Sequence, residues 1–286
     1  AMTVAEKGKA TGRLLTVTEE VKGGPEAEGR AVRFDIQKGK IFANLRIGAD
    51  VAGSPDLKSN TGLAFRGLIV GGAGFLVDDS IAQAWVEKHG QELASHLPEY
   101  IDGTVYIRGG KPKRLIDFPN FSEEELRASF PIVFQHLFDE VKPARNANRD
   151  KWIKQNWWKN IRPRYDFRAA RTGLDRYIAT CMTSKYRTFS MFDVATLPDQ
   201  ALVVFAIDAP WVLAALSSHF HVTWSLAAGG RLGVGNDPRY NNSLCFDPFP
   251  FPDPTEAQVA HLRSLGEQLD AHRKAQQAAH PKLTLT

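Results

Sequence analysis

The chain has 286 residues, 43% of them hydrophobic and 24% charged, a composition typical of a soluble globular protein and not of a disordered one. It contains no run of eighteen apolar residues, and its N-terminus lacks the charged-then-apolar layout of a signal peptide. We therefore expect neither export nor membrane spanning, and a cytoplasmic location. Cys181 and Cys245 lie far apart with no Cys or His at ligand spacing, which indicates neither a zinc site nor a disulfide framework.

The first half of the sequence predicts short strands interrupted by helices. The apolar run over residues 68–77 is interpreted as a buried strand or hairpin, and Asp78 begins a helix that extends to His89. Ser122 is a predicted N-cap, followed by acidic residues, for a helix that resumes after Pro131. Partial alternation predicts further strands over residues 13–20, 31–36, 40–47, 105–107 and 114–118.

The second half continues this mixed pattern. We predict a helix over residues 209–220 with Pro210 in its first turn, which would place His219 and His221 near its C-terminal, negative dipole end. Apolar residues at helical spacing predict an amphipathic helix beginning near Thr255. Strands are expected over residues 176–181, 187–193 and 201–207. The predicted fold class is α+β, with a mixed sheet or sheets, packed helices and a C-terminal amphipathic helix.

Positive charge is concentrated in one segment. Residues 142–187 carry 13 Lys and Arg against three Asp, a net charge of +10, whereas the whole chain has +4 and the other 240 residues therefore sum to −6. Trp and Tyr residues are interleaved with these cations, as in surfaces that bind polyanions. A solvated helix face is the alternative for charge alone, but it does not account for so basic a segment in an acidic remainder. The pattern favours nucleic-acid contact.

A second informative segment spans residues 236–254. Arg239, Asn241 and Asn242 carry the fork and amide groups that can read guanine and adenine edges, and a short apolar strand follows them. Prolines at 248, 250, 252 and 254 stiffen the exit. Taken alone, the segment is more simply an ordinary turn rich in Asn, Asp and Pro.

Candidate catalytic motifs are weak. Residues 71–75 resemble a glycine-rich nucleotide loop, but no acidic residue precedes them and a tight strand bend accounts for the glycines. Residues 237–240, Asp-Pro-Arg-Tyr, are similar to the Asp/Asn-Pro-Pro-Tyr motif that grips a flipped adenine, with an arginine replacing the second proline. Asp117 with Glu140 and Lys142 fits a metal-dependent nuclease, although the last two need no special purpose at a helix end. We predict no catalytic residue and no metal site.

Several motifs together resemble a known family. They occur in order at residues 45–51, 60–67, 72–77, 141–145, 157–158, 175–178, 184–187, 224–227 and 240–252, the last reading Tyr-Asn-Asn-Ser-Leu-Cys-Phe-Asp-Pro-Phe-Pro-Phe-Pro. From about Leu14 to the C-terminal helix, the chain resembles the target-recognition region of MmeI-like DNA methyltransferases, which are single-chain (type IIL) restriction–modification enzymes.

The resemblance implies a domain arrangement. In this family the recognition region follows an endonuclease domain and an adenine-N6 methyltransferase domain that uses S-adenosylmethionine. Neither is in this chain, so residues 1–250 would form the DNA target-recognition domain and residues 251–286 the start of a truncated C-terminal helical segment. The resemblance implies no cofactor for the fragment itself, with S-adenosylmethionine and Mg²⁺ required by the missing domains. Its expected partners are double-stranded DNA and those domains. No contact with a membrane is expected.

The resemblance also implies site residues. Family members read bases with side chains that follow a Gly-Arg-Leu turn, here residues 230–232. Relatives often carry charged readers where this chain has Gly-Val-Gly, which favours Asn236, Asp237 and Arg239. The candidate base-reading residues are Arg231, Gly233, Asn236, Asp237, Arg239 and Asn241. The candidate DNA-backbone contacts are Lys58, Ser59, Arg66, Lys151, Lys154, Lys185 and Arg187.

Two competing hypotheses remain open from the sequence. One is a fragment with its own DNA methyltransferase or nuclease activity, which methyl transfer or cleavage by the isolated chain would reveal. The other is a protein-interaction module whose basic aromatic segment faces the missing domains. Salt-dependent DNA affinity separates the latter from a DNA-binding domain.

Overall fold

A computed structural model describes residues 4, 8, 11–21, 31–42, 47–232 and 237–285. The chain divides into two compact units, Ala1–Pro55 and Asp56–Thr286. The predicted domain boundary at residues 250/251 is a different division of the chain, and it stays a prediction.

The smaller unit contains one antiparallel hairpin. Its strands are β1 (Gly12–Val21) and β2 (Ala31–Gly39), which confirm the strands predicted over 13–20 and 31–36. Val17 lies opposite Phe34, and the register is irregular between Val17 and Glu19. The predicted strand over 40–47 is reduced to a single bridge between Ile41 and Ile47, and residues 43–46 lie outside the described residues.

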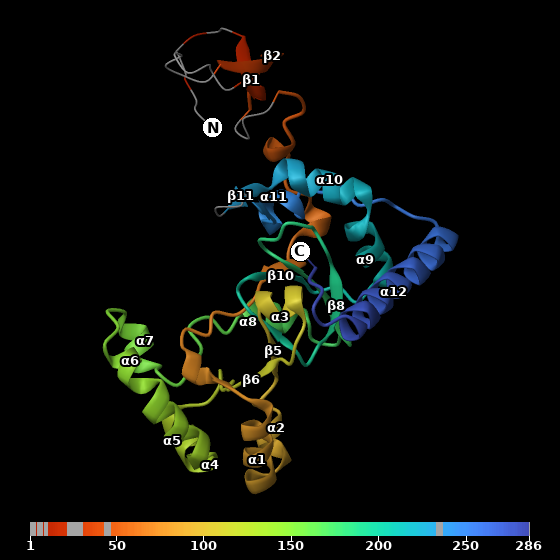
Figure 1. Cartoon of the computed structure of the whole chain (residues 1–286). Helices are drawn as coiled ribbons and strands as arrows, with labels where there is room; N and C mark the ends of the chain where they lie inside the picture. The colour runs from red at the N-terminus through yellow and green to blue at the C-terminus, as the bar shows by residue number, and fades with distance from the viewer. Residues whose placement is uncertain are drawn as a thin grey trace. The chain divides into compact units, whose positions relative to one another are not determined.

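A four-stranded antiparallel sheet forms the centre of the larger unit (Figure 1). Its strands, in spatial order, are β3 (Ala64–Arg66), β10 (Leu202–Phe205), β7 (Arg176–Cys181) and β8 (Ser190–Asp193). Because side chains alternate along a strand, Ile178 and Val203 enter one hydrophobic cluster while Tyr177 and Val204 enter another. The sheet is therefore buried on both faces.

A second, mixed sheet lies beside a group of helices. Its strands in spatial order are β4 (Leu76–Val77), β6 (Lys113–Leu115), β5 (Glu99–Ile101) and β9 (Leu197–Pro198), and only the β5–β9 pair is parallel. The helices of this region are α1 (Asp79–His89), α2 (Gln91–Ala94), α4 (Glu123–Ser129), α5 (Pro131–Glu140), α6 (Lys142–Asn146) and α7 (Lys151–Gln155). Helix α8 (Tyr165–Ala170) contributes its buried Phe167 to a cluster on the central sheet. One core containing Phe75, Leu115 and Leu137 joins this sheet to α1 and α5.

Helix starts agree with the sequence. Asp78 is the N-cap residue of α1, and Ser122 forms a reciprocal capping box with Glu125 at the start of α4. Thr255 forms the same motif with Gln258 at the start of α12 (Glu256–Ala279), the predicted C-terminal helix. These three starts are confirmed.

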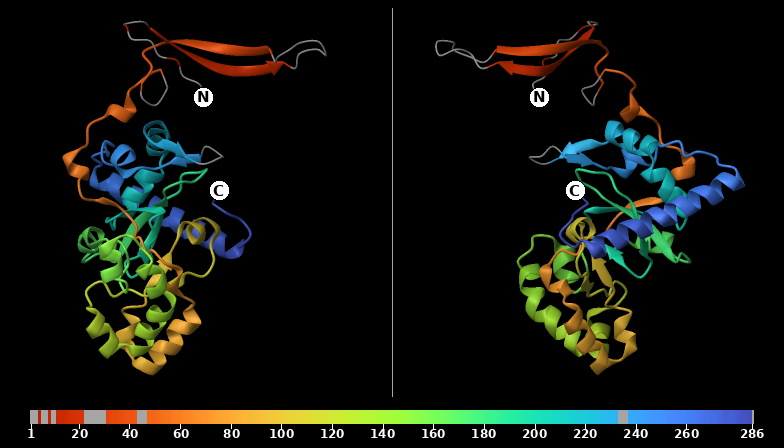
Figure 2. Two further views of the ribbon diagram at one scale, coloured as in Figure 1. Left: turned by 90° about the vertical axis from the view of Figure 1, so that its left-hand side faces the viewer. Right: turned by 45° about the vertical axis from the view of Figure 1, so that its right-hand side comes forward.

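Helix α12 packs closely on α9 (Pro210–Ser217) (Figure 2). A Cβ at position 266 would lie 2.0 Å from the carbonyl oxygen of Pro210, so only glycine fits there. Asp270 is buried on the same helix and accepts a 2.9 Å hydrogen bond from the Met191 backbone N–H. The helix is therefore joined both to α9 and to the edge strand β8.

Three sequence predictions were wrong. Residues 105–107 belong to helix α3 (Gly103–Arg108), because the Asp102 carboxylate caps the helix and Gly109 ends it. Residues after Asn241 form a short helix, α11 (Asn242–Cys245), in place of the apolar strand. The helix predicted over 209–220 breaks at extended Ser218, which caps α10 (His219–Ala228), so both histidines lie at a helix start and not at a helix end.

The α+β fold class is confirmed. Three further segments follow their predictions only partly. Residues 68–77 form single bridges at Leu68 and Ile69, then a 3-10 turn and β4. The strand predicted over 187–193 begins at Ser190, and the strand predicted over 114–118 ends at Leu115 as β6. In the described part of the chain, no helix has the length and apolar character needed to cross a bilayer.

Candidate functional site

The predicted base-reading residues surround a small hairpin. Strands β11 (Gly230–Leu232) and β12 (Asp237–Arg239) pair antiparallel and project from the body of the larger unit (Figure 2). Arg231 is exposed, and Asp237 and Arg239 are half-buried. The predicted readers Gly233 and Asn236 lie in the connection 233–236, outside the described residues.

The base of this hairpin is bound to the segment after β7. The backbone N–H of Tyr240 donates to the Met182 carbonyl at 2.7 Å, and that of Ser184 donates to the Pro238 carbonyl at 3.2 Å. Thr183 and Arg239 form an isolated antiparallel bridge. These bonds fix the position of β12 although the hairpin itself is short.

The Arg187 side chain is hydrogen-bonded both to β12 and to β7. Its Nη2 donates to the Pro238 carbonyl at 3.1 Å, and its Nη1 donates to Thr180 Oγ1 at 3.1 Å and to the Cys181 carbonyl. The guanidinium lies over the Tyr240 ring, 5.2 Å from its centroid, and burial lowers the pKa of Arg187. Arg187, a predicted phosphate contact, therefore makes its hydrogen bonds within the protein.

A buried histidine–tyrosine pair lies under the same strand. His221 and Tyr240 are 0% and 1% exposed, and His221 Nε2 lies 2.9 Å from the Tyr240 hydroxyl. Burial and the nearby positive charge of Arg187 lower the pKa of His221 to about 3, so the imidazole is neutral at physiological pH. The sequence interpretation missed this role. The available signal was Ser218, which caps the helix by accepting from the His221 N–H.

A second pair of predicted contacts lies near α11. The buried side-chain amide of Asn60 donates to the carbonyls of Phe246, Asp247 and Phe249 at 3.0, 3.1 and 2.8 Å. These bonds place the exposed residues Lys58 and Ser59 beside the chain that follows α11. The amide therefore connects two motifs that are 186 positions apart in sequence.

Two other predicted contacts flank these elements. Asn241 is the half-buried N-cap residue of α11, where its side chain makes no capping bond. Arg66 is exposed at the end of β3, where its Nη2 donates to the Gln200 carbonyl at 3.4 Å. In the described structure neither side chain is enclosed.

Many cations of the basic segment stabilise the fold. Arg145 is buried and donates to the Val70 carbonyl, and its burial lowers its pKa. Arg176 pairs with Asp208 and Glu267, which raise its pKa. The net charge of +10 therefore overstates the charge available to a ligand. The exposed cations of the segment, among described residues, are Arg149, Lys151, Lys154, Arg162 and Lys185.

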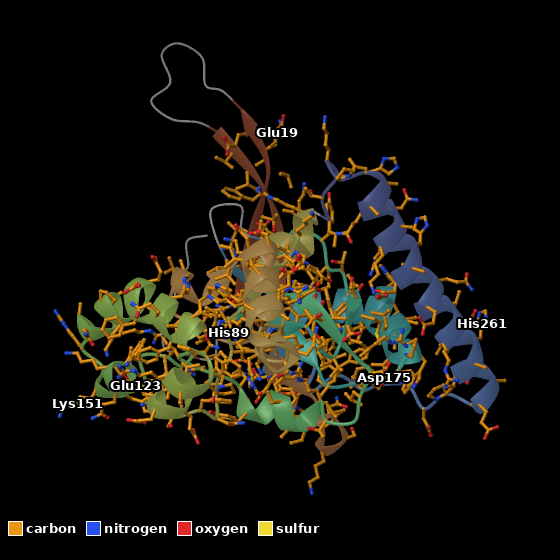
Figure 3. The ribbon with its side chains drawn as sticks, turned by 90° about the horizontal axis from the view of Figure 1, so that it is seen from below. Glu19, His89, Glu123, Lys151, Asp175 and His261 are labelled. Atoms are coloured by element: carbon orange, nitrogen blue, oxygen red, sulfur yellow. The ribbon has the colours of Figure 1, made fainter. Side chains whose placement is uncertain are left out.

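Lys151 and Lys154 are exposed on α7, and Figure 3 shows Lys151 at the outer surface of the helical region. Helices α5, α6 and α7 form one group, and the β11–β12 hairpin lies elsewhere in the larger unit (Figure 1). Lys185, by contrast, is next to Ser184 at the base of the hairpin. The structure therefore brings Lys185 together with Asp237 and Arg239, and it does not bring the two α7 lysines there.

Two of the three residues of the nuclease hypothesis, Asp117 and Lys142, make other contacts. Asp117 is buried, and its carboxylate accepts from Arg168 at 2.9 Å and from the Asn160 amide at 3.1 Å. Lys142 pairs with Glu123 at 3.4 Å. Within the described ranges no group of three or more His, Cys, Asp and Glu side chains could hold a metal ion, and both cysteines are buried thiols.

The geometry defines an α+β domain with a polar hairpin whose base is fixed by backbone hydrogen bonds. The chain resembles the solved structure of the type IIL restriction-modification enzyme MmeI in complex with DNA, with a TM-score of 0.66 and 17% identity. The match covers 92% of this chain and 39% of that chain. A comparison with curated proteins found no match. Residues 67–253 match the family model described as MmeI, target recognition domain, and the chain belongs to that family.

Proposed function

We propose that this chain binds duplex DNA in a sequence-specific way and serves as the target-recognition module of a larger protein. The observation that carries the proposal is the β11–β12 hairpin, whose base is fixed by backbone bonds to residues 182–184. Sequence readout requires side chains held in fixed positions at base edges. An anchored hairpin of this kind supplies such positions.

The side chains of the hairpin have the required chemistry. Arg239 can donate a bidentate pair to guanine, and Asp237 can accept from the cytosine amino group. Arg239 is half-buried, and its Nη2 lies 3.8 Å from the Met182 Sδ.

The larger protein is proposed to be an adenine-N6 methyltransferase with endonuclease activity. Family membership and the likeness to a much longer restriction–modification enzyme support this part. S-adenosylmethionine and Mg²⁺ would then be bound by its other domains, and this chain would not be an enzyme. Calorimetry on the isolated chain tests that statement. We expect no saturable S-adenosylmethionine binding. A clear binding isotherm for S-adenosylmethionine would support the methyltransferase hypothesis instead.

Binding-site selection on random duplex DNA tests the recognition function. We expect enrichment of one short sequence, with an affinity that falls steeply with salt, by roughly tenfold to a thousandfold between 50 and 200 mM. A pool that stays random, or an affinity that does not change with salt, contradicts the proposal. An affinity that does not change with salt favours a protein-interaction module.

A further inference from the structure

An open polar cleft lies next to the β11–β12 hairpin. It has a volume of about 850 Å³, and helix α3 contributes Thr104 and Arg108 to its lining. Lys185 and Asp237, both predicted DNA contacts, also line it, as does Ser184. The cleft therefore has α3 on one side and the base of the hairpin on the other.

Helix α3 is rigidly held. The Asp102 carboxylate caps it by accepting from the Val105 N–H at 2.8 Å. Tyr106 is buried, and its hydroxyl donates to the Thr188 carbonyl at 2.8 Å. At the C-terminal end, the Ile107 carbonyl accepts from the Leu285 N–H at 2.8 Å. Thr104 and Arg108, four residues apart, share the exposed face of a fixed helix.

The turn after α3 is open and basic. Gly109 and Gly110 have φ values of +72° and +114°, and no atom lies within 4 Å of a Cβ built at either position. The flanking Arg108 and Lys111 are exposed and have no ion pair within the described structure. Lys113 and Arg114, in contrast, pair with Asp78 and Asp79. Two cations without an ion pair in the described structure thus flank the Gly109–Gly110 turn. At this turn no side chain would prevent a DNA strand from approaching the backbone.

Three carboxylates also line the cleft, those of Asp102, Asp199 and Asp237. Asp102 caps α3 and Asp199 accepts a 2.5 Å hydrogen bond from the Tyr100 hydroxyl, so the protein fixes the position of both, and each keeps its negative charge. Asp237 belongs to the hairpin on the opposite side. Arg108, Lys111 and Thr104 supply guanidinium, ammonium and hydroxyl groups, which are the usual ligands of phosphate oxygens.

We propose that α3 and the Arg108–Lys111 turn hold one phosphodiester strand of duplex DNA along the side of the cleft opposite the hairpin. Arg108 and Lys111 contact phosphates directly, and Thr104 donates its hydroxyl to the same strand. This inference rests on the proposed DNA-binding function and adds an element that the basic segment does not contain. We call this arrangement the clamp: α3 and the Arg108–Lys111 turn contact the DNA backbone on one side of the cleft, and the β11–β12 hairpin reads bases on the other.

Salt dependence tests the clamp with a matched control. The double variant Arg108→Ala/Lys111→Ala is compared with Lys88→Ala/Arg263→Ala, which removes the same charge from exposed positions on α1 and α12. We expect the first to weaken binding to preferred and random DNA by roughly tenfold, and to flatten the slope of log affinity against log salt by about two. The control variant should keep the slope. Equal melting temperatures show that both variants are folded.

A crosslink gives a second, positional readout. Because Cys181 and Cys245 are buried, a photo-crosslinking maleimide on a Lys111→Cys variant labels the introduced thiol. We expect crosslinks to DNA at one position within the selected site. If wild type binds DNA but the two double variants behave alike and no crosslink forms, the clamp is wrong and the proposed function stands. If wild type does not bind DNA, both are wrong.

Discussion

The β11–β12 hairpin and helix α7 both present predicted DNA contacts, but the support beneath them differs. Below the hairpin lie the buried residues Tyr240 and His221 and the enclosed guanidinium of Arg187. Helix α7 has five residues, is capped by Asp150, and has Ile153 as its buried side chain. The difference indicates two kinds of contact. Fixed side chains can discriminate bases, whereas exposed lysines on an outer surface suit contacts with phosphates.

The comparison also shows why charge alone is a poor guide to a binding surface. Arginine sits in enclosed positions in the basic segment because its guanidinium can satisfy several carbonyl oxygens at once, as Arg187 does. Lys151, Lys154 and Lys185 of the same segment are exposed, as are Arg149 and Arg162. These cations and the hairpin side chains are therefore the groups left for a ligand.

The largest expected effect comes from removing the support of the hairpin. Tyr240→Ala deletes a ring that contacts Phe189, Phe205 and His221, so we expect a loss of about 3–5 kcal/mol of unfolding free energy. Tyr186→Ala, at an exposed ring, should change it by less than about 0.5 kcal/mol. Urea denaturation measures both. Equal losses would mean that Tyr240 has no special structural role.

Acid should weaken the hairpin support through His221. Its folded pKa of about 3 is below the unfolded value, so its stabilising contribution is complete above about pH 6.5 and is lost as the pH falls toward 3. The expected loss is about 1.4 kcal/mol per pH unit in that window. The double variant His221→Phe/Tyr240→Phe keeps the ring volumes and should show a flatter pH dependence of unfolding. An unchanged dependence would exclude His221 as the cause.

A smaller and different effect is expected at α7. Lys151→Ala/Lys154→Ala should weaken binding to all duplex sequences equally and flatten the salt slope by about two, with no change in stability. Titrations on preferred and random DNA at several salt concentrations measure this. A loss confined to the preferred sequence would mean that α7 reads bases and would remove the distinction between the two regions.

The sequence predicted elements whose signals are local. The caps at Asp78, Ser122 and Thr255, and the buried strands β7 and β10, depend on residues within one turn or one strand. It failed where local signals compete. Val105, Tyr106 and Ile107 favour a strand, but the cap at Asp102 and the glycines after Arg108 make the segment helical.

The site was less predictable because its contacts are long-range. Nothing near Asn60 in the sequence indicates that its amide binds three carbonyls at residues 246–249. Likewise, the neutral buried state of His221 depends on Tyr240 and Arg187, which come from other elements. The Gly-Arg-Leu motif located this region of the chain, although residues 230–232 form strand β11 and not the predicted turn. The contacts that support the hairpin could not be predicted.

The central claim is that the β11–β12 hairpin reads bases. The most direct measurement is the ratio of affinities for the selected site and for random DNA in Asp237→Ala and Arg239→Ala, with melting temperature as the control. We predict a loss of about 1–3 kcal/mol on the selected site and much less on random DNA, at unchanged melting temperature. Ratios equal to that of wild type in both variants would contradict the claim and make the hairpin a connecting turn.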